Sequence, residues 1–276
     1  MRNPGYNFHL GFNRRRRSFS ADLSYCENMV SNQHPTPLAT NALASSRTEA
    51  IPASKASGLR ALTQSPLGKK LLTGITGLGL VAFVVVHLLG NLTLFFSTSA
   101  YNQLAYILET LGPITYLIEL LLLAVALLHI HIGTKIYIGK RRARPVNYAE
   151  YRSAGKPSRQ SLSSQTMIVS GLLLGVFLVF HVATFKFGPY YELPESAHRD
   201  LSRLVFETFH KPAYTAGYVI VMGVLGLHLR HGLWSAMQSL GVATKPSAYA
   251  ASAMLGGAIA LGFIGLPLSI YFGLIG

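Results

Sequence analysis

The sequence contains a single cysteine, Cys26, and this scarcity narrows the redox chemistry open to the chain. One thiol cannot supply a cysteine-ligated iron–sulfur cluster, a CxxCH haem attachment or a disulfide framework. Any redox centre in this chain must therefore use other ligands, and histidine, with 10 copies, is the obvious one.

Charged residues are also few, at 12% of the chain, whereas 50% of the 276 residues are hydrophobic and mean hydropathy is +0.36. This balance is typical of an integral membrane protein and excludes an ordinary soluble domain. The net charge of +14 would suggest nucleic acid in a soluble protein, but basic loops on the cytoplasmic side of a membrane explain it better here. We expect a lipid bilayer as a partner and no nucleic acid.

The first 60 residues are polar and lack hydrophobic periodicity, which predicts disorder. Four arginines at 14–17 faintly resemble part of a transit peptide, and a wrongly assigned start, with Met29 as the true beginning, is an equally good explanation. We therefore divide the chain into a disordered tail, 1–65, either cleaved or mis-assigned, and a membrane domain, 66–276.

Five apolar stretches are long enough to cross a hydrocarbon core of roughly 30 Å. They are predicted at residues 71–96, 114–138, 164–187, 213–237 and 248–273. Glycine and proline separate them, and Pro267 inside the fifth stretch predicts a kink. The expected fold is an all-α membrane protein with five transmembrane helices.

Lysine and arginine gather on alternate loops, which predicts the orientation of the spans. Lys69 and Lys70 precede the first span, and the loop after the second span is strongly basic. That loop carries Lys140, Arg141, Arg142, Arg144, Arg152, Lys156 and Arg159. The 97–113 loop has no lysine or arginine, and the loop after the third span mixes bases with acids. We expect the N-terminus inside and the C-terminus outside.

Four histidines lie inside these spans, where an ionisable residue is costly and usually functional. They are His87, His129, His181 and His228. At the rise of an α-helix, His87 and His181 lie roughly 25 Å from the inner edge, and His129 and His228 roughly 15 Å. One intramembrane histidine often only bonds a neighbouring helix, but two depth-matched pairs across a four-helix bundle predict axial ligands for two haem irons. The fifth helix is expected at the periphery of that bundle.

Glycines follow three of these histidines by three or four residues on the same helical face, where they leave room for a porphyrin. They are Gly90, Gly133 and Gly232. The first and second halves of the bundle also resemble a loose duplication. The offset from His87 to His181 is 94 residues, and the offset from His129 to His228 is 99 residues.

Two further histidines compete for the inner haem. His131 is two residues from His129, and His231 is three residues from His228. We prefer His129 and His228 because each lies deeper and has glycine at position i+4. His231, beside Arg230, is assigned to a haem propionate or to the interface.

Three segments carry a resemblance to a known family: GKKLLTGITGLGLVAFVVVHLLGN, RRARPVNY and LHLRHGLWSAMQSLG. Over residues 66–273 the chain resembles the single-chain, five-helix, di-haem cytochrome b subunit of succinate dehydrogenases and fumarate reductases. The family implies two haem b groups and pairs span one with three and span two with four. Its span-four ligand corresponds to His228, while His131 stays an alternative to His129 in span two.

The resemblance also implies the reaction and the partners. Succinate oxidation to fumarate would be coupled to reduction of menaquinone or another quinone, or the reverse, in a bacterial cytoplasmic membrane. An iron–sulfur subunit and a flavoprotein subunit would dock on the cytoplasmic face. This chain would touch neither succinate nor flavin, and electrons would pass from the inner haem to the outer haem and then to quinone.

Quinone reduction needs protons, and two carboxylates are candidates for carrying them. Glu119 lies in the outer half of span two, and Glu109 lies at the outer interface. An intramembrane carboxylate is a proton-path hypothesis by default. The alternative for Glu119 is a hydrogen bond to a neighbouring helix, and the sequence leaves both open.

Two other functions stay open at this point. A di-haem cytochrome b could anchor another dehydrogenase, such as a hydrogenase or a formate dehydrogenase. A haem-free transporter or assembly factor could use the intramembrane histidines for protons or metal.

Overall fold

The computed structural model describes residues 63–143, 162–194, 196–242 and 245–276, all within one compact unit, Lys55–Gly276. The tail up to residue 62 and the loop at 144–161 lie outside the described residues. The expectations for a disordered, cleaved or mis-assigned tail therefore stay predictions.

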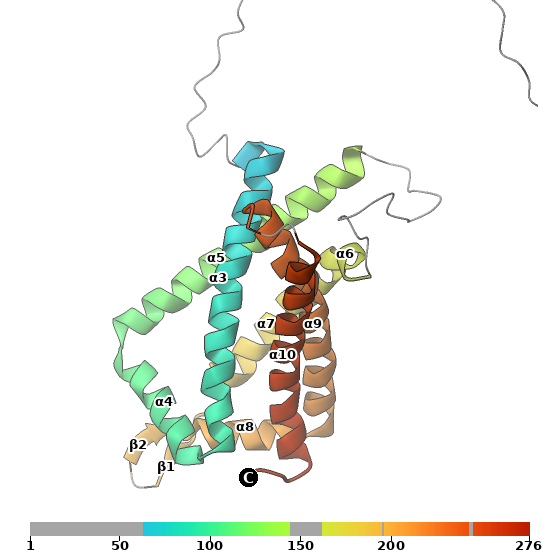
Figure 1. Ribbon diagram of the computed structural model, residues 1–276. Helices are drawn as coiled ribbons and strands as arrows, with labels where there is room; N and C mark the ends of the chain where they lie inside the picture. Colours follow the sequence, from blue (N-terminus) through green and yellow to red (C-terminus); the bar gives the residue numbers. More distant parts are fainter. Residues whose placement is uncertain (1–62, 144–161, 195, 243–244) are drawn as a thin grey trace, which may run out of the picture. The chain divides into compact units, whose positions relative to one another are not determined.

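Five long helices make up most of the described chain (Figure 1). They are α3 (Pro66–Leu92), α5 (Pro113–Ala143), α7 (Met167–Phe185), α9 (Pro212–Ser239) and α10 (Pro246–Tyr271). Each is long and apolar enough to cross a membrane. The predicted all-α membrane fold with five spanning helices is confirmed.

Proline and a side-chain cap set where several helices begin. Four helices have proline in their first turn, where a missing N–H breaks no helical hydrogen bond. These prolines are Pro66, Pro113, Pro212 and Pro246. Ser65 caps α3, because its hydroxyl accepts a hydrogen bond of 2.9 Å from the Gly68 N–H. The glycine–proline and lysine–proline breaks in the sequence therefore mark real helix boundaries.

Helix α10 is the most buried of the five spans, although it packs mainly against two of the four histidine-bearing helices. Within its apolar segment 33% of the residues are buried, compared with 6% to 17% in the other four spans. Small residues explain this, since a Cβ added at Gly226 of α9 would lie 2.9 Å from the Ala260 Cβ of α10. The helix continues through Pro267, which is fully buried. The fifth helix thus packs closely along α9 and also contacts α3.

The connections at 93–110 and 192–209 fold into a cap that the sequence analysis did not predict. The cap consists of η1 (Thr93–Phe95), α4 (Thr98–Thr110), β1 (Glu192–Leu193), β2 (Ser196–Arg199) and α8 (Leu201–Phe209). Strands β1 and β2 pair antiparallel, with Glu192 opposite Arg199. A single further turn, α6 (Leu162–Gln165), precedes α7.

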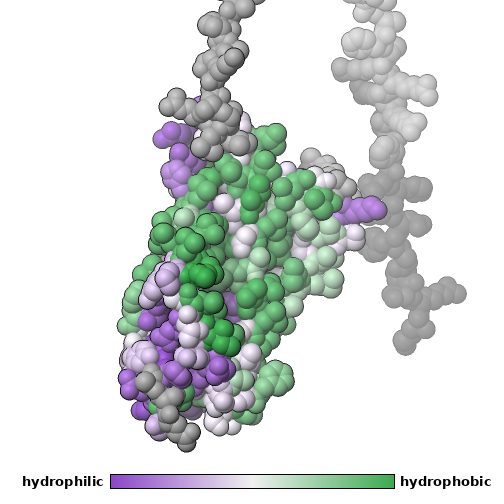
Figure 2. Space-filling model, turned by 90° about the vertical axis from the view of Figure 1, so that its left-hand side faces the viewer, coloured by the Kyte–Doolittle hydropathy of each residue, from purple (hydrophilic) through white to green (hydrophobic). Residues whose placement is uncertain are grey.

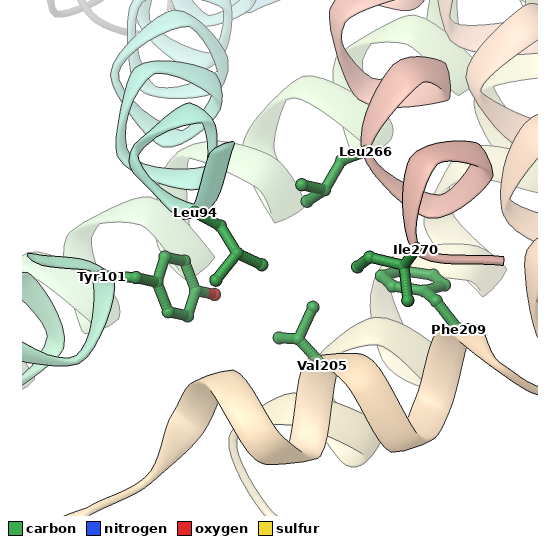
Figure 3. Close-up of a cluster of buried hydrophobic side chains, with 6 residues drawn as sticks. All are labelled: Leu94, Tyr101, Val205, Phe209, Leu266 and Ile270. Carbon is green, nitrogen blue, oxygen red and sulfur yellow. The ribbon is translucent and has the colours of Figure 1, made fainter. Parts of the chain in front are cut away.

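The cap has an apolar core and a polar clasp. The core consists of Leu94, Tyr101, Val205, Phe209, Leu266 and Ile270, from η1, α4, α8 and α10 (Figure 3). In the clasp, the Asn102 side-chain amide donates to Asp200 Oδ1 at 2.9 Å and to Ser202 Oγ at 3.1 Å. The Ser202 N–H donates back to Asn102 Oδ1 at 2.9 Å. Because Asn102 is only 5% exposed, these bonds tie α4 firmly to α8.

The surface of the helices suits lipid. Apolar side chains cover the middle of the face in Figure 2, and hydrophilic residues gather toward its ends. Leu120, Leu172 and Val179 are 63%, 68% and 70% exposed, which is unfavourable in water and favourable in a bilayer. This supports a bilayer environment, while the predicted inside-to-outside orientation stays a prediction.

Candidate functional site: histidines on four helices

The four predicted ligand histidines come from four different spanning helices, and each is half-buried. His87 lies on α3, His129 on α5, His181 on α7 and His228 on α9. The helices that carry them contact one another as α3 with α5 and α9, and α7 with α5 and α9. The arrangement places all four imidazoles between helices and away from the ends of the bundle.

The outer pair is in direct contact. The ring centroids of His87 and His181 lie 5.7 Å apart, with the ring planes at 89°. A metal–imidazole bond is about 2 Å long, so two imidazoles on opposite sides of one metal have centroids on the order of 6 Å apart. The centroids of the two rings are therefore separated by close to that distance.

Aromatic side chains surround the outer pair. Phe83 stacks on His87 at 5.5 Å, and Phe177 and Phe185 lie 5.6 Å and 5.3 Å from the His181 ring. Two polar groups of the described residues reach these rings: the Tyr218 hydroxyl lies 3.2 Å from His181 Nδ1, and the Asn91 amide nitrogen lies 3.4 Å from His87 Nε2. This apolar lining would exclude water from a cofactor bound between the two histidines.

The inner histidines are held differently, each by a hydroxyl and a glycine on the neighbouring helix. His129 Nδ1 lies 3.2 Å from Thr76 Oγ1, and a Cβ on Gly77 would lie 3.0 Å from His129 Cε1. The ring of His129 therefore rests on the surface of α3.

His228 repeats this contact on α7. Its Nδ1 lies 2.9 Å from Ser170 Oγ, and a Cβ on Gly171 would lie 3.2 Å from its Cε1. Sequence reasoning missed both hydroxyl–glycine pairs, although the same dipeptide type precedes His87 and His181 at equal spacing.

The competing histidines occupy less favourable positions. His131 is exposed on α5, whereas His129 packs against α3, so the geometry favours His129 as the ligand. His231 is half-buried one turn beyond His228 on α9, where the sequence placed it. Its contact with a haem propionate stays a prediction.

The three predicted glycines differ in what surrounds them. A Cβ added at Gly133 or Gly232 would meet nothing within 4 Å, so both leave open space. A Cβ at Gly90 would lie 3.3 Å from Leu104 of α4, so this glycine lets the cap approach α3. Its place beside a cofactor stays a prediction.

Glu119 forms an ion pair with Lys186, the C-cap residue that follows α7, and both side chains are about two-fifths exposed, at 40% and 38%. Lys186 also lies over the Tyr116 ring, 5.4 Å from its centroid. Glu109 is exposed near the end of α4. The proton path remains a prediction for both carboxylates, and the ion pair is the helix-to-helix contact that the alternative for Glu119 required.

Two buried guanidinium nitrogens lack partners among the side chains that the structure describes: Arg199 Nε and Arg230 Nε. Arg199 donates through Nη2 to the Phe185 carbonyl at 2.9 Å, one helical turn from His181. Arg230 lies on α9 between His228 and His231. The Arg230 guanidinium lies over the Tyr249 ring of α10, 5.4 Å from its centroid.

Within the described ranges no group of three or more His, Cys, Asp or Glu side chains is arranged to hold a metal ion. A haem iron needs only two axial protein ligands, so this observation does not bear on the histidine pairs. Comparison with protein-family models, curated proteins and solved structures found no match to this chain. The resemblance drawn from the sequence motifs therefore stays a prediction.

Proposed function

We propose that this chain is the membrane anchor and electron-transfer subunit of a succinate:quinone oxidoreductase and holds two b-type haems. The observation that carries the proposal is the contact between His87 and His181, whose ring centroids are 5.7 Å apart on two spanning helices. The VHLLGN and HLRHGLWSAMQSLG segments support a succinate or fumarate complex over a hydrogenase or formate dehydrogenase.

The chain's own residues account for the tasks that such a subunit needs. His87 and His181 would hold one haem, and His129 and His228 the other, which supplies one-electron transfer with no open iron position for oxygen chemistry. The phenylalanines around the outer pair keep water out. Arg199 and Arg230 would be the cationic donors to the haem carboxylates, since each has a buried Nε without a described partner.

The two ends of the bundle would serve different partners. The basic residues at the start of α3 and the end of α5 suit docking of an iron–sulfur subunit and a flavoprotein subunit on the cytoplasmic face of a bacterial membrane. Menaquinone or another quinone would react near the outer pair, with Glu119 and Glu109 as proton carriers. The N-terminus would lie inside and the C-terminus outside.

The decisive experiment is a count of haem in the purified membrane complex. A reduced-minus-oxidised spectrum and a pyridine haemochrome assay should give two b-type haems per chain, and succinate should reduce both. Co-purification of a flavoprotein with succinate:quinone activity would support the partner assignment. A chain that carries no b-type haem would overturn the proposal, and haem reduced by hydrogen or formate but not by succinate would identify the other dehydrogenase class.

A further inference from the structure

The hydroxyl–glycine contact at the inner histidines occurs twice at the same register. Thr76–Gly77 on α3 and Ser170–Gly171 on α7 are 94 residues apart, the same offset that separates His87 from His181. In each helix the hydroxyl stands eleven residues before the outer histidine, from 76 to 87 and from 170 to 181. At 1.5 Å per residue, the hydroxyl residue and the outer histidine are about 16 Å apart along each helix.

The hydroxyl protons are already used within their own helices. Thr76 Oγ1 donates to the Leu72 carbonyl at 2.7 Å, and Ser170 Oγ donates to the Met167 carbonyl at 3.1 Å. A hydroxyl has one proton and two lone pairs, so an oxygen that donates to its own helix accepts from the imidazole beside it. With the hydroxyl protons placed in this way, the Nδ1 atoms of His129 and His228 carry the imidazole protons.

This assignment leaves Nε2 of each inner histidine with a free lone pair. In a neutral imidazole one nitrogen donates and the other accepts, and the hydrogen bond at one nitrogen decides which nitrogen can bind a metal. Gly77 and Gly171 add a steric restraint, because a Cβ there would lie 3.0 Å and 3.2 Å from the ring carbon Cε1. Hydroxyl and glycine together fix both the tautomer and the position of the ring.

We infer that Thr76 and Ser170 are positioning residues for the inner haem, an inference that rests on the proposed function. They accept the Nδ1 protons of His129 and His228 and so present Nε2 to the iron. A hydrogen bond from Nδ1–H makes an imidazole a stronger donor to the metal, which favours oxidised iron. The outer pair has one such hydroxyl, that of Tyr218 at 3.2 Å from His181 Nδ1, and phenylalanine rings pack against its imidazoles.

The test uses the intact complex with Thr76→Val and Ser170→Ala, and follows the two haems separately by redox titration and by electron paramagnetic resonance. We expect the oxidised-to-reduced ratio of the inner haem at a fixed potential to fall by up to about tenfold. For a one-electron couple, tenfold corresponds to about 59 mV. The resonance of the inner ferric haem should shift as well, and the outer haem should stay unchanged.

Matched controls separate this role from general damage to the bundle. Thr73→Val and Ser252→Ala remove hydroxyls that bond only the carbonyls of Lys69 and Ala248 in their own helices, and both should leave the two potentials unchanged. Thr76→Ser and Ser170→Thr keep the hydroxyl and should restore the wild-type potential.

Each result either supports or overturns the inference. Unchanged potentials and resonances in both variants, or a shift confined to the outer haem, would overturn it. If Ser170→Ala prevents assembly, assembly of Ser170→Thr with two haems supports the role of the hydroxyl, and failure of both variants overturns it. A wild-type complex without b-type haem would overturn the proposed function instead, before any variant is made.

Discussion

The inner and outer histidine pairs occupy opposite kinds of surroundings. The inner pair is held by hydroxyls at 3.2 Å and 2.9 Å and by glycines on the neighbouring helices. The outer pair lies among phenylalanines, with one tyrosine hydroxyl at 3.2 Å. Because both proposed ligand pairs are histidines, a difference between the two proposed haems would come from these surroundings.

These surroundings predict which of the two haems has the lower reduction potential. Hydrogen-bonded imidazoles stabilise oxidised iron, and an apolar lining disfavours the extra positive charge of oxidised iron. The inner site should therefore have the lower potential and the outer site the higher one. Electrons that pass from the inner site to the outer site would move downhill toward quinone.

Removing one ligand from each pair is the largest test of this comparison. His228→Ala should lose only the inner haem, and His87→Ala only the outer haem, because the pairs lie on separate levels of the bundle. Haem content should fall from two to one per chain in each variant, by pyridine haemochrome assay. Loss of both haems from each variant, with the helical spectrum intact, would contradict independent sites.

Glu119→Gln tests whether the ion pair beyond the outer histidines is structural or moves protons. A proton carrier should lower quinone-linked turnover on the order of 100-fold with intact haem spectra. Lys186→Gln is the control, since it breaks the same ion pair and keeps the carboxylate. Equal losses in both variants would assign the pair to helix packing, and normal turnover in Glu119→Gln would exclude the proton path.

Filling the glycine contact should disturb the inner site alone. Gly77→Ala places a Cβ 3.0 Å from His129 Cε1, so the ring must shift and haem affinity should fall about tenfold. Gly79→Ala on the same helix meets nothing within 4 Å and serves as the control. Haem retention during dilution measures the effect, and equal retention in both variants would contradict the contact.

Tyr218→Phe removes the hydroxyl beside the outer pair. We expect a shift in the outer haem's oxidised-to-reduced ratio of about two- to threefold, smaller than for Ser170→Ala. The reason is the distance to His181 Nδ1, 3.2 Å, which is longer than the 2.9 Å at His228. The same redox titration measures this shift. A shift in the inner haem's ratio instead would show that the haem assigned to the inner pair is the one beside Tyr218.

Acid should weaken the cap before it affects the bundle interior. Burial alone would raise the pKa of Asp200, but hydrogen bonds from Ser202 and Asn102 hold it below the usual 3.8. Its stabilising effect is therefore complete above pH 3.8 and is lost as the pH falls through the lower folded-state pKa. Asp200→Ala should cost about 1 kcal/mol at pH 7 through the lost α8 cap, and less in acid.

Thermal unfolding in detergent, followed by circular dichroism at pH 7 and at a pH below 3.8, measures how the cost of Asp200→Ala changes with pH. Glu109→Gln is the control, because Glu109 is an exposed acid on the neighbouring cap helix. A cost for Asp200→Ala that is the same in acid and at pH 7 would show that the carboxylate does not act in its charged form.

Much of the fold could be predicted because a membrane helix is recognised by its own composition. The spans predicted at 114–138 and 213–237 lie within α5 (Pro113–Ala143) and α9 (Pro212–Ser239). The cap could not be predicted in this way. Its clasp joins Asn102 to Ser202, residues 100 positions apart, and neither lies in a long apolar run.

The sequence by itself determined the depth of each histidine, because the rise per residue of an α-helix is fixed. That was enough to place His87 with His181, and the structure brings their rings together. Only the tertiary structure decided which atoms face each ring, because rotation and tilt of a helix depend on its neighbours. Thr76 beside His129 and Ser170 beside His228 follow from that packing. The repeated hydroxyl–glycine pair marks both positions in the sequence but does not specify which ring each one contacts.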